Sequence, residues 1–408
     1  MNIEYDILII GGGAAGFFSA INTAEQNPTC KIAILERGKE VLTKVKISGG
    51  GRCNVTHAEF IPKDLSKNYP RGEKELLGPF HSFMTGDTIA WFQERGVELK
   101  IEEDGRMFPT SNSSQTIIDC FVSETKRLGI DVLKNTSVKN IVKTAEGFTL
   151  STTSEVFCSK KLVVASGSNP KIWKLLENLG HTIIPPVPSL FTFNIKEESI
   201  LDLQGITTEV TVEVLSEKGK VTLTSEGPLL ITHWGMSGPA ILKLSAWGAR
   251  ILEPTNYKFK IRVNWLEYFN LEDATEKLLE LKRLNPKQTL QKYAQFDLPK
   301  RLWQNLLRAA SIPETQTWAD VTKKQLVKLS EMLTKSIFQV EGKSTFKEEF
   351  VTAGGVNLKE VNFKTFESKI NSNLYFAGEV LNIDAITGGF NFQNAWTGGY
   401  IVAQSISN

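Results

Sequence analysis

The sequence predicts an α/β protein with a doubly wound, mostly parallel sheet, interrupted by an insert of antiparallel strands and helices. Three observations predict this class. A strand leads into a glycine-rich turn and a helix at the start of the chain, and a strand followed by glycine and acid lies near its end. Between them the pattern changes to alternating strands and then to helical spacing. With 408 residues, the chain is long enough for two or three domains.

The chain begins with a short apolar strand and a glycine-rich turn. Ile7–Ile10 suits a strand buried on both faces, and residues 14–24 are small and apolar enough for a helix packed on a sheet. Between them Gly11, Gly13 and Gly16 fit G-x-G-x-x-G. The first glycine permits a tight turn, the second lets backbone approach a pyrophosphate, and the third lets helix and strand come close.

An acid ends the second predicted strand, residues 31–35. Glu36 follows Gly16 at about the spacing that brings a carboxylate to a ribose hydroxyl in this fold. The helix N-terminus offers N–H groups and positive dipole to phosphates, and the charge of Glu36 would repel a 2′-phosphate. The pattern predicts a dinucleotide site, and these residues alone leave NAD and FAD open.

The end of the chain returns to the same site. Residues 374–377 predict a buried strand, Gly378–Glu379 follow at its carboxyl end, and Gly388–Gly389 lead into a helix that begins at Phe390. Ligands of a doubly wound sheet bind outside the carboxyl ends of its strands, so both ends of the chain can share one crevice. A short ligand would not need both.

Residues 46–54, KISGGGRCN, place three consecutive glycines between Lys46 and Arg52. Bare backbone near positive charge suits a phosphate or a flat ligand, and no Gly-Lys-Ser/Thr follows to make a P-loop. On this stretch alone a flexible surface turn is an equal alternative.

The middle of the chain predicts an insert. The proline-rich stretch 183–190 indicates a boundary. Five segments beyond it alternate apolar and polar residues, which predicts an antiparallel barrel or sandwich: residues 190–195, 206–215, 220–225, 228–234 and 257–265. From about residue 271 three segments have helical spacing, and VTAGGV, residues 351–356, re-enters the first domain. The predicted division is 1–188 (cofactor domain), 189–268 (β domain), 269–340 (helical subdomain) and 341–408 (cofactor domain). A cleft between cofactor domain and insert is the expected substrate site.

Several long motifs resemble one family. The N-terminal glycine pattern with Glu36, LVVASG (162–167) and YFAGE (375–379) are similar to the signatures of two-dinucleotide-fold (Rossmann-like) flavoproteins. KISGGGRCNVTH, DGRMFPTS, ITHWGMSGPAIL, VTAGGV and LYFAGEVLNIDAITGGFNFQNAW resemble the YhiN/BaiN-type flavoproteins, which include aminoacetone oxidases. Where that family tends to read Leu-Asp-Val-Asp-Gly, this chain has Asn382 and Ala385.

The resemblance implies FAD as the resident cofactor, with KISGGGRCN against the flavin. It implies that Val138, on the strand after DVLKN (131–135), contacts adenine through its backbone and that Glu379 holds a ribityl hydroxyl. The full set of expected cofactor-binding residues is Gly11, Gly13, Ala14, Ala15, Gly16, Glu36, Arg37, Lys46, Gly50, Gly51, Arg52, Cys53, Asn54, Val138, Gly167, Gly378, Glu379, Gly389, Phe390, Asn391 and Phe392.

Two residues are candidates for catalysis. His233 could move a proton or bind substrate, and Arg106 could hold an anionic group. A structural histidine at a turn and a solvated arginine are the competing interpretations. Trp234 and Trp396 could line the pocket or fill the core, and Cys53 is expected to be a small buried residue and not a redox thiol.

Composition limits the partners. Lys plus Arg number 47 and Asp plus Glu 45, a balance of +2 that favours neither nucleic acid nor an acidic membrane. Four dispersed cysteines without a CxxC pair, an acidic start, and the lack of a long apolar run favour a reduced, cytoplasmic protein without metal or membrane span. Oligomeric state is not indicated.

The function predicted is an FAD-dependent oxidoreductase that transfers hydride between a small organic substrate and flavin N5. NAD(P)H could serve as a transient electron donor. The alternatives are a NAD(P)H-fed flavin reductase of an unsaturated substrate, and an FAD-containing binding or sensory module without turnover.

Overall fold

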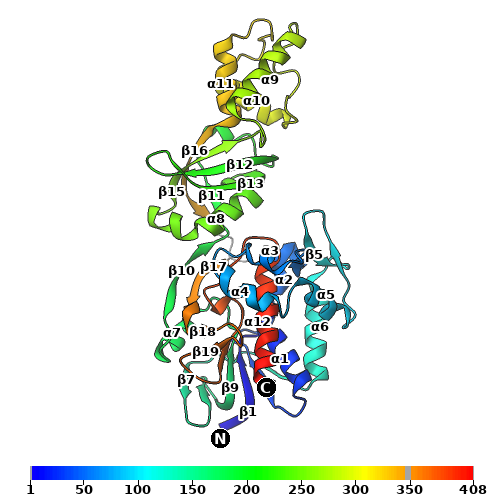
Figure 1. Ribbon diagram of the computed structural model, residues 1–408, viewed down its shortest axis with the longest axis vertical. Helices are drawn as coiled ribbons and strands as arrows, with labels where there is room; N and C mark the ends of the chain where they lie inside the picture. The colour runs from blue at the N-terminus through cyan, green and yellow to red at the C-terminus, as the bar shows by residue number, and fades with distance from the viewer. Residues whose placement is uncertain (1, 345–350, 408) are drawn as a thin grey trace. The chain divides into compact units, whose positions relative to one another are not determined.

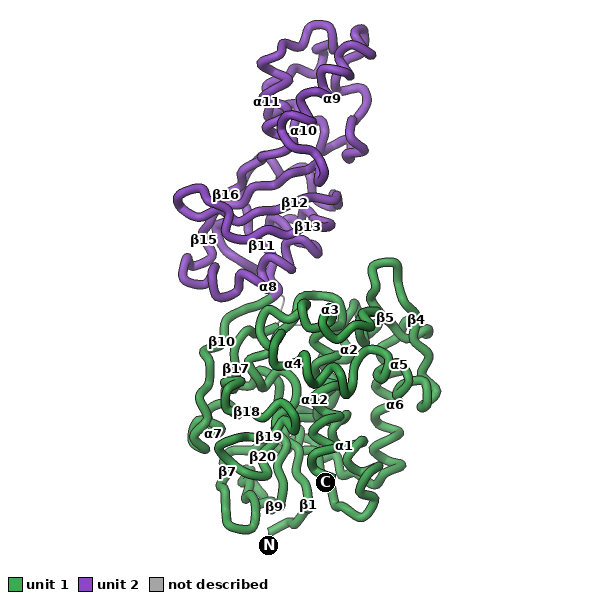
Figure 2. The backbone as a smooth tube through the Cα atoms, viewed as in Figure 1, with its two compact units in different colours: residues 1–189, 347–408 green, residues 190–346 purple. Residues whose placement is uncertain are grey.

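The computed structural model describes residues 2–344 and 351–407. The chain forms two compact units, residues 1–189 with 347–408 (unit 1) and residues 190–346 (unit 2), coloured separately in Figure 2. The sequence placed the corresponding changes at 188/189 and 340/341. The insert extends past the second position because strand β16 (Ser336–Ser344) pairs with two strands of unit 2.

Unit 1 is built on a nine-stranded sheet with the order β18-β19-β20-β9-β1-β2-β6. Its centre is parallel, because β20, β9, β1, β2 and β6 run in the same direction. The buried runs expected of such strands are present, since every residue of β2 is buried. The parallel strands are β1 (Asn2–Ile10), β2 (Ile32–Leu35), β6 (Asp131–Leu133), β9 (Val156–Val164) and β20 (Leu374–Phe376). This sheet confirms the predicted fold class.

Shorter strands extend the unit. The antiparallel members of the large sheet are β7 (Asn140–Lys143), β8 (Phe148–Ser151), β18 (Val361–Asn362) and β19 (Glu367–Ser368). A separate sheet contains β3 (Thr56–His57), β4 (Leu99–Ile101) and β5 (Arg106–Pro109). The proline-rich stretch is itself a strand, β10 (Ile183–Ser189), which pairs with β17 (Val351–Val356) across an irregularity between Ile184 and Val187.

Helices cover the parallel sheet, and the two that flank the site, α1 (Ala14–Gln26) and α12 (Phe390–Ser407), lie side by side (Figure 1). They approach closely because Gly399 has no side chain: a Cβ there would lie 3.1 Å from Ser19 Oγ. The other helices of unit 1 are α2 (Thr43–Gly51), α3 (Pro62–Ser66), α4 (Glu73–Phe80), α5 (Thr85–Gln93), α6 (Ser114–Arg127) and α7 (Pro170–Asn178).

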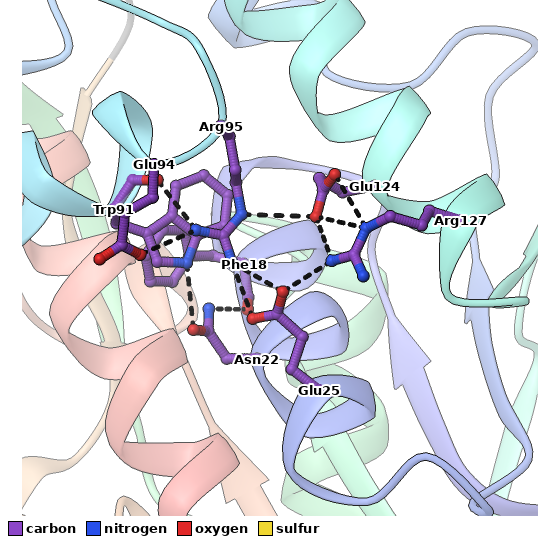
Figure 3. Close-up of polar contacts among 8 residues, drawn as sticks. All are labelled: Phe18, Asn22, Glu25, Trp91, Glu94, Arg95, Glu124 and Arg127. Atoms are coloured by element: carbon purple, nitrogen blue, oxygen red, sulfur yellow. Dashed lines mark hydrogen bonds and ion pairs between the residues drawn. The ribbon is translucent and has the colours of Figure 1, made fainter.

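Polar contacts from α6, from α5 and from the residues that follow α5 hold the C-terminal part of α1 in place (Figure 3). The Arg95 guanidinium lies 3.8 Å from the Trp91 ring and donates hydrogen bonds of 2.8 and 2.7 Å to the Glu25 carboxylate of α1. Trp91 Nε1 donates to Asn22 on the same helix, at 3.1 Å. Arg127 of α6 bonds both Glu25 and Glu124, and these contacts lower the pKa of Glu124.

Unit 2 contains a closed six-stranded barrel with the order β11-β14-β13-β12-β15-β16. Alternate residues of β12 are buried, as the period of the sequence predicted. Two predicted strands, residues 220–225 and 228–234, are one continuous strand because the pairing with β12 runs through Gly227 and Pro228. The strands are β11 (Thr192–Asn194), β12 (Thr207–Leu215), β13 (Val221–Thr232), β14 (Gly235–Ser237), β15 (Lys258–Asn264) and β16.

Helix α8 (Pro239–Leu252) packs on the barrel, and three helices interrupt it between β15 and β16: α9 (Leu271–Leu284), α10 (Lys300–Ala309) and α11 (Lys323–Thr334). One continuous apolar core includes barrel residues such as Val212 and helix residues such as Trp303 and Leu329. The helical part is therefore joined to the barrel through its core. Among the described residues, no helix combines the length and apolarity needed to span a membrane.

Candidate functional site

Four parallel strands end at the same level of the sheet. Ile10 is paired with Leu35 of β2 and Val164 of β9, and Val164 is paired with Phe376 of β20. The residues after each strand, which carry the predicted motifs, therefore lie along one edge. In parallel α/β sheets this edge is where ligands bind.

Close backbone contacts join the three motifs there. A Cβ on Gly11, whose φ is +115°, would lie 2.4 Å from Ala165 O of LVVASG, and a Cβ on Gly16 would lie 2.0 Å from Gly11 O. A Cβ on Gly378 would lie 3.1 Å from the Ala15 Cβ. The glycines are thus required where the chain crosses itself, and the start, middle and end of unit 1 converge here.

Other glycines at this edge face open space. A Cβ on Gly13 or on Gly50 would meet no atom within 4 Å. Gly13 is the N-cap of α1, and no side chain caps this helix. Room above bare backbone, beside the N–H groups of a helix N-terminus, fits the pyrophosphate of a dinucleotide.

The Glu36 carboxylate lies beside this turn. It accepts hydrogen bonds from Gly12 N at 2.8 Å and Gly38 N at 2.7 Å. Arg37 next to it is exposed. Val138 is buried, but the sequence placed it on a strand and this is wrong: it lies in the connection between β6 and β7, because the β6 ladder ends at Leu133.

The KISGGGRCN stretch is a broken helix and not a loop. Lys46 and Ile47 continue α2, and the backbone then departs from helical geometry at Ser48, Gly49 and Gly50, the last two left-handed. Gly49 packs closely, since a Cβ there would lie 2.8 Å from the Phe108 ring. Gly51, also left-handed at φ +83°, would place its Cβ only in ordinary contact with the protein.

Cys53 and Asn54 follow the break. Cys53 is fully buried, and burial raises the pKa of its thiol to about 12, so it is protonated at neutral pH. This agrees with its expected role as an inert residue. Asn54 Oδ1 is buried without a hydrogen-bond partner among the described residues, and a Cβ on Gly389 would lie 2.8 Å from it. An orphaned acceptor beside glycine backbone fits a ligand donor.

The cations of this stretch are held by acids. Lys46 lies 3.4 Å from the exposed Glu40, whereas Lys44, which the sequence did not single out, lies 2.5 Å from Glu379. A Cβ on Gly167 would lie 3.8 Å from the Glu379 carboxylate. Glu379 therefore connects the glycine motif of β9, the end of β20 and helix α2.

Arg52 and Arg106 meet at one ring. The Arg52 guanidinium lies 3.9 Å from the Phe108 ring centroid and that of Arg106 lies 5.4 Å from it. Glu102 bonds Arg52 at 2.5 Å and lies 3.7 Å from Arg106, which also bonds Asp104 at 2.6 Å. The cofactor candidate and the catalytic candidate are thus neighbours through the β4–β5 hairpin, and both are paired with acids in this structure.

The start of α12 packs on β3. The His57 ring stacks on Phe390 at a centroid distance of 4.5 Å, and its Nδ1 lies 3.0 Å from Gly388 O. The Asn391 carboxamide accepts from Ala385 N at 3.0 Å and donates to Ala385 O at 3.3 Å, which holds the preceding loop. Ala385 does not have the positive φ that would require glycine.

The aromatic residues of α12 separate into two groups. Phe392 stacks on Trp396 at 5.5 Å, and Trp396 is fully buried with its Nε1 donating to Val55 O. Trp396 is therefore part of the core and does not line a pocket. Phe390 lies at the start of the helix beside the glycine loop.

A buried ion pair supports the loop before α12. Asp384, which is fully buried, accepts from Arg71 Nε at 2.5 Å and from a second guanidinium nitrogen, and Ser189 Oγ donates to it at 2.7 Å. Sequence reasoning missed Arg71 because no motif marks it.

The second catalytic candidate belongs to unit 2. His233 lies on the turn between β13 and β14 and is exposed, as is Trp234, with 63% of its surface accessible. Thr232 Oγ1 accepts from Trp234 N and Gly235 has φ +142°, which fix the turn. Neither side chain is needed to fill a core.

The amino-acid sequence matches the family model described as HI0933-like protein Rossmann domain over residues 5–405. It is 31% identical to the ribosomal RNA dihydrouridine synthase of Haemophilus influenzae, over 98% of each chain. It is 26% identical to the 3-dehydro-bile acid delta(4,6)-reductase of Clostridium scindens, over 97% of this chain and 98% of that one. The solved 3-ketosteroid-delta4-(5alpha)-dehydrogenase of Rhodococcus jostii, at 11% identity and TM-score 0.53 over 100% and 97% of the two chains, shares the fold.

Proposed function

Because the chain belongs to the HI0933-like Rossmann family, a family of flavoproteins, we propose that it is an FAD-dependent reductase of a conjugated carbon–carbon double bond. We propose further that the double bond is that of a uracil base in ribosomal RNA. The observation that carries this choice is the 31% identity, over 98% of both chains, to a ribosomal RNA dihydrouridine synthase.

The names of two relatives describe the same chemistry on different substrates. Dihydrouridine differs from uridine by saturation of the C5–C6 bond, which is conjugated with the C4 carbonyl. A delta(4,6)-reductase acting on a 3-dehydro bile acid likewise saturates a double bond conjugated with a ketone. Reduction of a double bond conjugated with a carbonyl would add hydride to the carbon distant from the carbonyl and a proton to the neighbouring carbon. This shared reaction favours a reductase over the oxidase that the sequence left open.

The residues of unit 1 supply binding and orientation for the cofactor. The N-terminus of α1 and the open backbone at Gly13 suit the pyrophosphate, and Glu36 suits the adenosine ribose. Glu379 follows Gly378, and the Asn54 carboxamide lies beside Gly389. Both therefore suit the polar groups of the cofactor that lie nearer the flavin. FAD held by these residues would supply hydride chemistry to the substrate.

Positive charge near this end of the site would stabilise a reduced, anionic ligand. Lys44 and Arg52 lie there, paired with Glu379 and Glu102. The reductant we infer is NAD(P)H. Since the sequence has one strand–G-x-G-x-x-G–helix pattern, which the resident FAD would occupy, NAD(P)H would have to visit the flavin transiently. The oxidised nicotinamide would then leave before the substrate binds.

His233 and Arg106 stay candidates for the proton donor and the substrate anchor. His233 is exposed on a turn that the core does not require, which suits contact with a ligand. Arg106 is ion-paired with Asp104 and Glu102, so it would act only after exchanging a carboxylate for substrate. His233→Asn would lower the rate of substrate reduction and leave reduction of flavin by NAD(P)H unchanged if the histidine supplies the proton.

The test is reduction of the flavin by a nicotinamide, followed by its reoxidation by the substrate. The purified protein is titrated anaerobically with NADH and NADPH while the flavin absorbance is followed. It is then mixed with protein-free ribosomal RNA, with uridine monophosphate, or with a steroid bearing a 4,6-dien-3-one. We expect a nicotinamide to bleach the flavin and ribosomal RNA to restore it with formation of dihydrouridine, detected by mass spectrometry of nucleosides. Restoration by the steroid alone would retain the reductase and reject the RNA substrate. Flavin that ignores both nicotinamides but is bleached by a small amine would reject the reductase.

A further inference from the structure

Although the whole chain is nearly neutral, its positively and negatively charged residues are unevenly distributed along the sequence. The chain has 47 Lys and Arg and 45 Asp and Glu residues. Residues 282–335 contain 11 of the cations and 4 of the acids, so the rest of the chain contains 36 cations and 41 acids. This segment thus carries a net charge of +7, and the rest of the chain carries −5. The four acids of the segment are Asp297, Glu314, Asp320 and Glu331. The sequence-wide balance, from which no nucleic-acid partner was expected, does not describe this region.

The segment comprises the last residues of α9, including Lys282 and Arg283, together with α10, α11 and the loops around them, in one part of unit 2 (Figure 1). The acidic residues of the neighbouring helix α9, Glu272, Asp273, Glu276 and Glu280, precede it. Two of its cations serve the fold, since Lys282 donates to Ala319 O and Val321 O, and Arg301 donates to Asp202 O and Gln204 O. The other nine are exposed, and within residues 2–344 and 351–407 none of them forms an ion pair: Arg283, Lys287, Lys292, Lys300, Arg308, Lys323, Lys324, Lys328 and Lys335.

One of these cations, Lys328 of α11, contacts Ser311 in the connection that follows α10. Lys328 Nζ donates to Ser311 Oγ at 3.0 Å, and Ser311 N bonds the carbonyl of Arg308 at 2.9 Å. Lys324 lies one turn before Lys328 on the same face of α11, and Lys323 precedes it. We call Arg308, Lys323, Lys324 and Lys328 the α10–α11 patch.

Stability of the helix does not account for these lysines. Lys323 and Lys324 occupy the first turn of α11, where the helix dipole disfavours positive charge. Thr322 and Gln325 already cap this end through a reciprocal pair of hydrogen bonds. Near the segment's other end, the exposed Tyr293 ring lies 5.1 Å from Lys292 Nζ and offers a face on which a base could stack.

We propose that the α10–α11 patch binds the phosphate backbone of the RNA substrate. The inference rests on the proposed function, because it takes RNA as the partner. Unpaired, exposed lysine and arginine side chains are the groups that neutralise phosphates and release counterions, and this binding is independent of sequence. Unit 2 would in this way retain the large substrate, while the base itself is read and reduced at the flavin.

The experiment compares two triple variants of the flavin-loaded protein. Lys323→Ala, Lys324→Ala and Lys328→Ala remove the charges of α11, and alanine favours the helix. The matched control replaces three exposed lysines of unit 1, Lys126, Lys171 and Lys364. Binding of protein-free ribosomal RNA is measured by filter retention across a series of salt concentrations, and kcat and KM are measured for dihydrouridine formation.

Each phosphate contact contributes about 0.7 to the slope of log K against log salt for a single strand. Loss of three contacts should reduce the slope by about 2. If the affinities converge at 1 M salt, this corresponds to binding about 100-fold weaker at 0.1 M. We expect the α11 variant to show this loss and a raised KM for RNA, with kcat and the rate of flavin reduction by nicotinamide unchanged, and the control variant to resemble the wild type.

An α11 variant that binds and reduces RNA as the wild type does would overturn the patch and leave the proposed function intact. Equal weakening in both triple variants would also overturn it, since net charge and not this patch would then govern binding. Wild-type protein that neither binds ribosomal RNA nor forms dihydrouridine in it would overturn both. Retention by anionic lipid vesicles without any retention of RNA would assign the patch to a membrane surface and reject RNA.

Discussion

Replacement of Arg71 by methionine tests how the loop before α12 is held. Asp384 is fully buried, and its carboxylate is bonded by the Arg71 guanidinium and by Ser189 Oγ. Burial raises the pKa of Asp384, while the contacts with Arg71 and Ser189 lower it. Without Arg71, Ser189 is left to oppose the effect of burial on the pKa of Asp384, so the carboxylate becomes a buried charge without a cationic partner.

The expected cost is large. Removing one partner of a buried ion pair typically lowers the free energy of unfolding by about 3–5 kcal/mol, and Arg71→Met should fall in that range at neutral pH. Asp384→Asn leaves Arg71, whose side chain is 14% exposed, with access to water and should cost less. The double variant leaves no buried carboxylate at this position, so it should be more stable than Arg71→Met alone.

The loss should depend on pH in a defined direction. In Arg71→Met the folded-state pKa of Asp384 lies above its unfolded value of about 3.9, so the folded state holds the proton more tightly. The stability that this protonation contributes is fully present below the unfolded pKa and is lost as pH rises through the folded pKa. The variant should therefore be closest to the wild type at acid pH, with the gap widening by up to about 1.4 kcal/mol per pH unit.

The assay is urea unfolding followed by the release of flavin fluorescence, which reports unit 1, at several pH values between 5 and 8. Arg71→Lys is the matched control, because lysine keeps the charge but loses the two-pronged contact. A destabilisation that is the same at pH 5 and pH 8, or a double variant that loses the sum of the two single losses, would refute the reasoning.

Three further changes test the site and the fold. Glu36→Gln should weaken FAD binding by about 10- to 100-fold, the equivalent of one charge-assisted hydrogen bond of about 1.5–3 kcal/mol, in a flavin fluorescence titration, and unchanged affinity would remove Glu36 from the site. Gly16→Ala should destabilise unit 1 by about 1–3 kcal/mol or more in urea, because its Cβ would lie 2.0 Å from Gly11 O; a neutral effect would contradict the close approach. Burial lowers the pKa of His181 although it contacts Glu360, so the stability it contributes is present above its unfolded pKa of about 6.5 and lost as pH falls through the folded value. His181→Gln should flatten the decline of stability on the acid side of pH 6.5, and an unchanged profile would assign that decline to other groups.

Much of unit 1 could be predicted because its signals are local. The run Ile7–Ile10, the glycines after it and Glu36 lie within one strand-turn-helix-strand segment. Neighbouring residues therefore indicate which positions are buried and where the backbone needs glycine. The same holds for α9, α10 and α11, whose apolar spacing gives each helix one buried face. Val138 was misplaced for a local reason too, since an apolar residue after a turn does not reveal whether it pairs with another strand.

The sequence by itself determined the fold class, the dinucleotide pattern and the family. Only the tertiary structure decided which of its charged groups meet. Arg71 and Asp384 lie 313 residues apart, and Lys44 and Glu379 lie 335 apart, so no periodicity or spacing links them. Such pairs form because the sheet aligns the ends of β1, β9 and β20 and carries distant loops to one edge. At the break of α2, Gly49 likewise packs closely against Phe108 of β5, a contact that the local sequence does not reveal.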